Sequence, residues 1–121
     1  MDAITESGAL EYGVEIGGVV HREFTLRPAM LADSYQAALQ VPVPDKLDDA
    51  THRVAYQMAI DDAMVLTQLT QLGTLTCVPP PVELAKLLDP DDMVQLRVAA
   101  EAVKKKRRGL SNTPSPSDSS N

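Results

Sequence analysis

Residues 14–28 read VEIGGVVHREFTLRP, two runs of alternating apolar and polar residues on either side of the pair Gly17-Gly18. Such runs around two glycines are typical of a β-hairpin. Pro28 has no backbone N–H to donate to a sheet, so the second strand should end just before it. The sequence therefore predicts a hairpin over residues 10–27.

The length of the hairpin loop decides which side chains share a face. A two-residue loop would place acidic residues of the first strand opposite apolar residues of the second. A three-residue loop over residues 16–18 instead places Val14 beside Val20 and Leu10 beside Phe24. We expect the three-residue loop. Because two strands alone are marginally stable in water, this apolar face needs a cover, from the first helix and the long helix or from a second subunit.

Four segments with apolar residues at helical spacing follow the hairpin. Asp48 or Asp49 is placed to cap the long second segment, and Gly73 to stop it. The pair Asp89-Pro90 is a typical helix start, with further acidic residues in the first turn. We expect helices at about residues 29–40, 49–72, 82–88 and 90–107.

These elements predict an α+β fold, in which an N-terminal β-hairpin packs on a small bundle of three to four α-helices. The predicted domain covers residues 10–108 of the 121 in the chain. Residues 1–9 are polar and acidic, and we expect a flexible arm. Residues 109–121 are rich in Ser and Pro, and we expect a disordered tail. Because only 3% of the residues are aromatic, self-association would help to stabilise the aliphatic core.

Composition narrows the class of protein. A net charge of −6 argues against a nucleic-acid binder, whose affinity comes largely from neutralising phosphates. A single cysteine, Cys77, excludes an internal disulfide. The sequence lacks the basic and then apolar pattern of a signal peptide, and no apolar run approaches the roughly 20 residues of a membrane span. We expect a soluble intracellular protein.

No group of residues has the spacing of a catalytic or metal site. His21 lies on a predicted strand and His52 near a helix start, and neither has Cys or carboxylate neighbours at ligand spacing. Cys77 has no adjacent base. The Gly17-Gly18 pair precedes a strand, so it is not a phosphate-binding loop, which needs a helix. We expect a non-enzymatic protein without a cofactor.

The acidic residues have structural interpretations. The three aspartates within residues 89–92 fit helix capping better than a calcium loop, which needs a glycine and a distal glutamate. Asp61 falls on the polar side of the long helix, whereas Asp62 falls within its apolar face. For Asp62 we expect a rim position or an ion pair with an arginine such as Arg22 or Arg27.

Several motifs together resemble the Mu-type phage tail assembly chaperones. They are the hairpin, the phrase HREFTLRP at residues 21–28, the aspartate Asp33, the element ELAKLL at residues 83–88, and the Asp-started helix over residues 89–108. The resemblance covers roughly residues 10–108. It implies a chaperone of the host cell cytoplasm that binds the tape measure protein, keeps it soluble, brings tail tube protein to it, and is absent from the mature virion.

The long helix carries the partner-binding hypothesis. Tyr56, Ile60 and Met64 form a second apolar row, apart from the main apolar face. Methionine adapts to varied apolar partners, which suits the holding of an extended client. The alternative is that the hairpin or the first helix covers this row within the chain.

The basic run over residues 104–108 fits a solvated helix end, where cations suit the helix dipole, better than a nucleic-acid site. Two other functions stay open. The first is a structural minor tail protein retained in the virion. The second is a regulatory adaptor that uses this basic run on nucleic acid.

Overall fold

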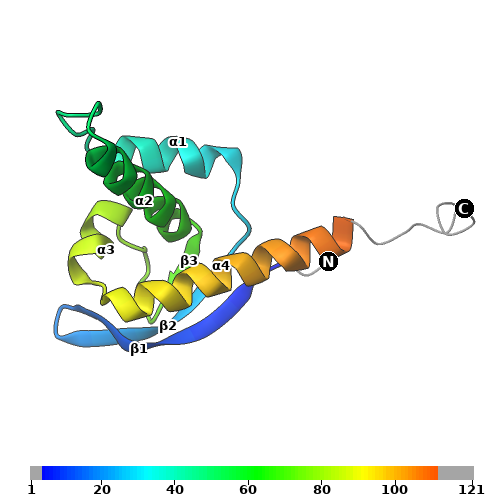
Figure 1. Ribbon diagram of the computed structural model, residues 1–121. Coiled ribbons are helices and arrows are strands. Elements are labelled where there is room, and N and C mark those ends of the chain that lie inside the picture. The colour runs from blue at the N-terminus through cyan, green and yellow to red at the C-terminus, as the bar shows by residue number, and fades with distance from the viewer. Residues whose placement is uncertain (1–3, 112–121) are drawn as a thin grey trace, which may run out of the picture.

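The computed structural model describes residues 4–111, which form three strands and four helices (Figure 1). Their order is β1 (Glu6–Ile16), β2 (Val19–Leu26), α1 (Leu31–Gln40), α2 (Ala50–Thr67), β3 (Leu69–Leu72), α3 (Pro81–Leu87) and α4 (Pro90–Ser111). The strands make one antiparallel sheet in the order β1-β2-β3. The predicted α+β class, a hairpin packed on helices, is confirmed.

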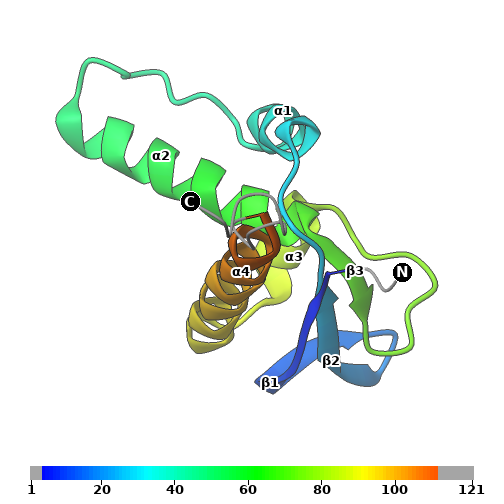
Figure 2. The ribbon, with the colours of Figure 1, turned by 90° about the vertical axis from the view of Figure 1, so that its right-hand side faces the viewer.

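The helices lie on one side of the sheet. Figure 2 shows the sheet at the lower right, α4 beside it, and α1 and α2 above, with the N-terminal half of α2 reaching away from the sheet. The core lies where the sheet, α4, α3 and the C-terminal end of α2 meet. Leucine supplies most of this core, as the aromatic-poor composition requires. Its fully buried side chains include Leu26, Leu72, Leu84, Leu96 and Val103.

The predicted three-residue hairpin loop is wrong. Ile16 pairs with Val19 and Glu15 with Val20, so the loop is the two residues Gly17 and Gly18 alone. Their φ angles of +60° and +80° are those of a type I′ turn, whose twist matches the strands and which glycine adopts without strain. The expected penalty for Glu15 opposite Val20 does not arise, because both side chains are exposed.

An irregularity in β1 restores the apolar face that the short loop would have lost. Ala9 pairs with Glu23 and Val14 with His21, so four residues of β1 lie opposite the single residue Arg22. This wide bulge shifts the register, and both Leu10 and Val14 reach the core. At its end, Gly13 has a φ of +84°, and a Cβ there would come within 2.7 Å of a Val20 methyl group.

The bulge removes backbone N–H groups from the β ladder, and α4 supplies their acceptor. The carboxylate of Asp92, which is 0% exposed, accepts hydrogen bonds from the amides of Glu11 at 2.8 Å, Tyr12 at 3.2 Å and Gly13 at 2.9 Å. The expectation that all three aspartates of residues 89–92 cap the helix is therefore wrong for Asp92. Asp89 does act as a cap, since its Oδ1 accepts from the amide of Asp91 at 2.8 Å.

Further side chains fasten α4 along β1. Gln95 donates to the carbonyl of Ala9 at 3.1 Å, and Lys106 donates to the carbonyl of Thr5 at 2.9 Å and pairs with Glu6 at 2.5 Å. Residues 6–9 are thus part of β1 rather than of the predicted flexible arm, and residues 1–3 lie outside the described part. The main cover of the hairpin is α4, and Leu66 at the end of the long helix adds to it, whereas the first helix contributes nothing to this core.

The long helix is shorter than predicted. It begins after Asp49, which is the cap of the two residues considered, but it ends at Thr67, and residues 69–72 form β3. Leu72 pairs with Phe24 and Leu69 with Leu26, so β3 satisfies the otherwise free edge of β2 while Leu69 and Leu72 stay in the core. Apolar periodicity alone does not distinguish a longer helix from a strand here, because either would bury Leu69 and Leu72.

The remaining predicted boundaries differ by a few residues. The first predicted helix begins at Leu31 rather than at 29, because Arg27 and Pro28 lead into an extended Met30 cap. The short third helix is Pro81–Leu87. Residues 109–111, expected to belong to a disordered tail, are the last residues of α4, and the rest of the expected tail, residues 112–121, lies outside the described part.

Replacement of Asp92 should destabilise the fold more than replacement of its neighbour. Asp92→Ala leaves the amides of Tyr12 and Gly13 without an acceptor and the amide of Glu11 with the Gln95 side chain alone, and we expect a loss of about 2–4 kcal/mol in the free energy of unfolding. Asp91→Ala removes an exposed first-turn charge and should cost no more than about 0.5 kcal/mol. Urea unfolding followed by circular dichroism measures both. Equal effects of the two substitutions would contradict the role given to Asp92. If Asp92→Ala does not fold, Asp92→Asn is measured in its place.

Candidate binding groove

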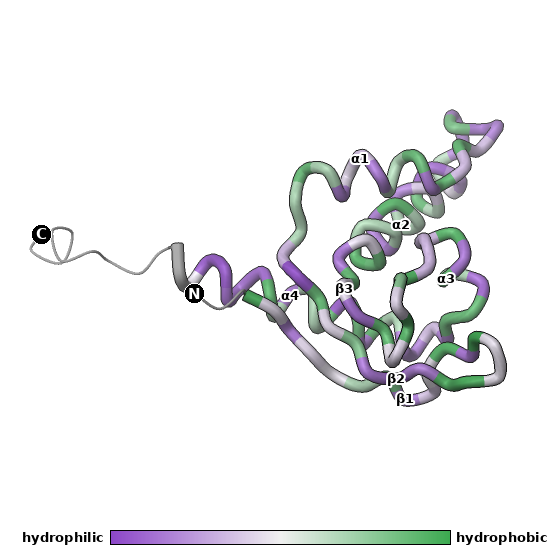
Figure 3. Tube along the Cα trace, turned by 180° about the vertical axis from the view of Figure 1, so that it is seen from behind, coloured by the Kyte–Doolittle hydropathy of each residue, from purple (hydrophilic) through white to green (hydrophobic). Residues whose placement is uncertain are grey.

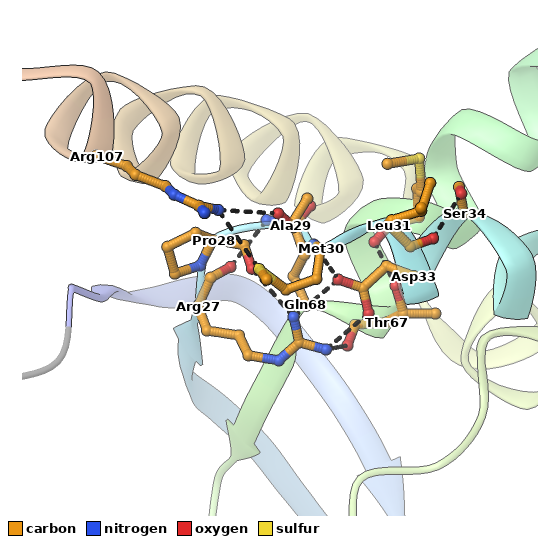
Figure 4. Close-up of polar contacts among 11 residues, drawn as sticks. Arg27, Pro28, Ala29, Met30, Leu31, Asp33, Ser34, Thr67, Gln68 and Arg107 are labelled. Carbon is orange, nitrogen blue, oxygen red and sulfur yellow. Dashed lines mark hydrogen bonds and ion pairs between the residues drawn. The ribbon is translucent and has the colours of Figure 1, made fainter. Parts of the chain in front are cut away.

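The Arg27–Asp33 pair connects the sheet to the first two helices (Figure 4). The guanidinium donates to the two carboxylate oxygens at 2.7 and 2.8 Å, to the carbonyl of Pro28 at 3.0 Å and to the carbonyl of Thr67 at 3.1 Å. Asp33 also accepts from the amide of Met30 at 2.7 Å, which closes the first turn of α1. One ion pair therefore joins the end of β2, the start of α1 and the end of α2.

The environment of this pair favours its charged form. Hydrogen bonds from the Arg27 guanidinium hold the pKa of Asp33 below its usual value, against the opposing effect of burial. The same contact raises the pKa of Arg27. Gln68 makes two further hydrogen bonds to the backbone of Arg27. Its side-chain amide donates to the carbonyl of Arg27 at 2.9 Å, and its backbone carbonyl accepts from the backbone amide of Arg27 at 3.0 Å.

The residues that carry the resemblance therefore have structural roles. Within the phrase at residues 21–28, Phe24 and Leu26 belong to the core and Arg27 pairs with Asp33. His21 is buried, and its Nδ1 accepts from the amide of Thr74 at 3.3 Å, which sets the chain after β3 against β2. These residues build the scaffold and leave the task of binding to another surface.

A groove lies between α2 and α4, beside the linker that follows β2. It has a volume of about 730 Å³. Its apolar lining residues are half-buried and are called its floor here, namely Pro28, Ala29, Met64, Val65 and Ala100. Its charged lining residues are exposed and are called its rim, namely Asp61, Glu101, Lys104, Arg107 and Arg108. We call this feature the α2/α4 groove. An apolar floor with a charged rim is the usual form of a site that binds an amphipathic helix.

A second hollow of about 300 Å³ continues the groove towards the N-terminal end of α4. The two hollows share lining residues from both helices, among them Asp61 and Glu101. There Arg97 donates twice to Asp62, at 2.8 Å each, and holds α2 to α4. Asp62 thus forms an ion pair, as one of its two interpretations expected, but neither Arg22 nor Arg27 is its partner.

Of the predicted partner-binding row, Met64 lines the groove. Tyr56 and Ile60 are also half-buried but are not among the lining residues, so the row does not act as one surface there. Met58, on the same helix, is exposed and lines the second hollow. The partner-binding role of the three residues stays a prediction.

Some residues of the basic run, residues 104–108, bind other parts of the chain, and others line the groove. Lys106 binds the start of β1, and Arg107 donates to the carbonyl of Ala29 at 3.3 Å (Figure 4). Lys104 and Arg108 line the groove and have no ion-pair partner within the described residues. Figure 3 shows this end of α4 as strongly hydrophilic. The run is therefore more than a solvated helix end.

The other candidate residues do not form a site together. His52 is exposed and its Nδ1 lies 3.0 Å from Asp49, and Cys77 is exposed in the connector before α3. Within residues 4–111, no three His, Cys, Asp or Glu side chains come together as metal ligands would. The helices of this part of the chain also lack the combined length and apolar character required to cross a membrane.

Sequence reasoning identified Met64 but missed the acidic half of the groove and the rest of its floor. Glu101 and Ala100 follow regular helical spacing and give no local signal. Pro28 and Ala29 belong to a linker. The groove exists only because α2 and α4, which are remote in sequence, lie side by side. The signal available in the sequence was the presence of charged residues on one side of both α2 and α4, which could have indicated that the two helices line one groove.

Comparison of the chain with protein-family models, with curated proteins and with solved structures finds no match. The resemblance to the Mu-type chaperones therefore rests on the motifs themselves.

The ion pair should make stability depend on pH in the acidic range. Because the pKa of Asp33 is lowered in the folded state, its contribution is complete above its ordinary pKa and is lost as the pH falls through the folded-state value. Asp33→Asn should cost about 2 kcal/mol near neutral pH, and this difference from the wild type should shrink as the pH falls below the ordinary aspartate pKa of about 4.

Urea unfolding at a series of pH values measures this difference. Asp45→Asn, in the exposed connector between α1 and α2, is the matched control and should follow the wild type throughout. A difference between Asp33→Asn and the wild type that stays constant to the lowest pH at which both proteins fold would contradict the role of the pair.

Proposed function

We propose that this protein is a tail assembly chaperone of a Mu-like phage or prophage. It binds the tape measure protein in the host cytoplasm, keeps it soluble and helps to bring tail tube protein to it, without enzymatic chemistry. Two lines support the proposal. The motifs over residues 10–108 resemble the family, and the fold presents a groove suited to a helical client.

The α2/α4 groove is the observation that carries the proposal. A tape measure protein is a long, largely helical chain that exposes apolar faces before the tail tube forms around it. The groove offers an apolar floor, with Met64 and Val65 from one helix and Ala100 from the other, to bury such a face. Burial of this kind is reversible, as a chaperone requires.

Exposed apolar residues outside the groove are consistent with several copies of this protein binding side by side on one client. Leu31, Tyr35 and Leu39 on α1 are each more than 60% exposed, and Val54 on α2 is 60% exposed. Neighbouring copies on a long client would cover some of this area by self-association.

The two other functions remain as alternatives with separate tests. A structural minor tail protein would be present in stoichiometric amount in purified virions, where mass spectrometry would detect it. A regulatory adaptor would bind DNA or RNA with a steep salt dependence. Two observations disfavour the second alternative. Lys106 and Arg107 donate to backbone carbonyls of this chain, and the groove rim carries acidic residues that would repel phosphates.

Co-expression with the tape measure protein of the same genome tests the proposal. We expect this chain to raise the soluble fraction of the tape measure protein and to co-purify with it, because the client's apolar faces become covered. Absence of both effects would refute the chaperone function, and stoichiometric presence in virions would favour the minor tail protein.

An acidic residue in the groove floor should weaken this interaction. Met64→Glu places a charge where the client's apolar face would lie, and co-purification should fall by about tenfold or more. Val98→Glu, at an exposed position on α4 that lies outside the groove lining, is the matched control and should retain the client. Circular dichroism verifies that both variants fold. A loss with Val98→Glu but not with Met64→Glu would place the client outside the groove.

A further inference from the structure

We infer that the α2/α4 groove holds its client helix in one direction, set by opposite charges at its two ends. The client would carry a basic side chain at the acidic end of the groove and an acidic side chain at the basic end, on the same side of its apolar stripe. This inference rests on the proposed function and adds the chemistry of the segment that is bound.

The acidic end is formed by two carboxylates from facing helices. Asp61 of α2 accepts only from the side chain of Gln57, at 2.9 Å, and Glu101 of α4 has no ion-pair partner within the described residues. The nearby Arg97 is already neutralised by Asp62. Both free carboxylates remain available to a cation of the client.

The basic end is formed by α4 and the linker after β2. Lys104 and Arg108 line the groove without an ion-pair partner in the described part of the chain. Arg107 is directed to the carbonyl of Ala29 and the sulfur of Met30, yet keeps its charge beside them. This end therefore attracts a carboxylate of the client.

The spacing of the two ends matches a helix. Glu101 and Arg108 are seven residues apart on α4, which is about two turns or roughly 10 Å. A client helix lying along α4 would place charged side chains seven residues apart at the two ends. Its intervening positions three and four residues along would face the apolar floor.

The charge pattern favours a protein helix over nucleic acid. A phosphate backbone would gain at Lys104 and Arg108 but would be repelled by Asp61 and Glu101. A second copy of this chain is a further alternative, since an antiparallel α4 would also bring Glu101 near Lys104. Both alternatives give distinct results in the experiment below.

The experiment uses two synthetic helical peptides of about 18 residues with identical composition and apolar stripe. One has Lys followed by Glu seven residues later beside the stripe, and the other has Glu followed by Lys. Each carries a nitroxide at its N-terminus and is added to the ¹⁵N-labelled full chain. Paramagnetic broadening of the amide signals then reports which end of the groove lies near the nitroxide.

We expect the Lys-first peptide to broaden signals near Met58 and Asp61, and the Glu-first peptide to broaden those near Ala29 and Arg108. A peptide with two lysines at these positions should bind about fivefold or more weakly than either, because one lysine would face the basic end. The double variant Glu101→Lys/Lys104→Glu should weaken or reverse the direction of each peptide.

A broadening pattern that does not change with the order of charges would overturn the inference. So would peptide binding outside the groove, dimerisation through α4 that excludes both peptides, or their displacement by a single-stranded oligonucleotide. These results leave the proposed function standing if the tape measure protein still co-purifies. If the peptides bind with the expected directions but the tape measure protein does not co-purify, the proposed function is refuted, whereas the inference that charges set the direction of a bound helix is kept.

Discussion

The contact between the Asp92 carboxylate and the bulge of β1 is the constraint on which the rest of the structure depends. Three amides of one strand converge on a single buried carboxylate of α4, so the strand and the helix fix each other's position. Gln95 and Lys106 extend this contact along the helix. Because α4 is also one wall of the groove, the geometry of the candidate site follows from a contact on its opposite side.

The second wall of the groove is positioned by the Arg27–Asp33 pair. This pair holds the end of α2 against the end of β2 and starts α1 at the same point. Both walls are thus tied to the sheet, and the Asp62–Arg97 pair joins them directly. The groove is a fixed gap between anchored helices, and its floor residues need not pack tightly against each other to keep it open.

The sequence predicts the elements well and their associations poorly. The glycine pair marks the hairpin turn, although the loop is one residue shorter than predicted, and Asp49 and Asp89-Pro90 mark two helix starts; all are local signals. The bulge, β3 and the role of Asp92 depend on partners that are far away in the chain, so periodicity could not reveal them. The same reason applies to the site. Met64 was predicted from its helix, whereas Glu101 acquires a role only when α4 lies beside α2.

The separation between Asp92 and the bulge has a consequence for the order of folding. The hairpin is synthesised first, but its carboxylate partner lies 79 to 81 residues further along. A nascent chain therefore exposes the apolar face of the hairpin and three open amides until α4 has left the ribosome. Contacts so distant in sequence slow the folding of a small domain. A protein proposed to shield the apolar surface of another would, during its own synthesis, be exposed to the same hazard.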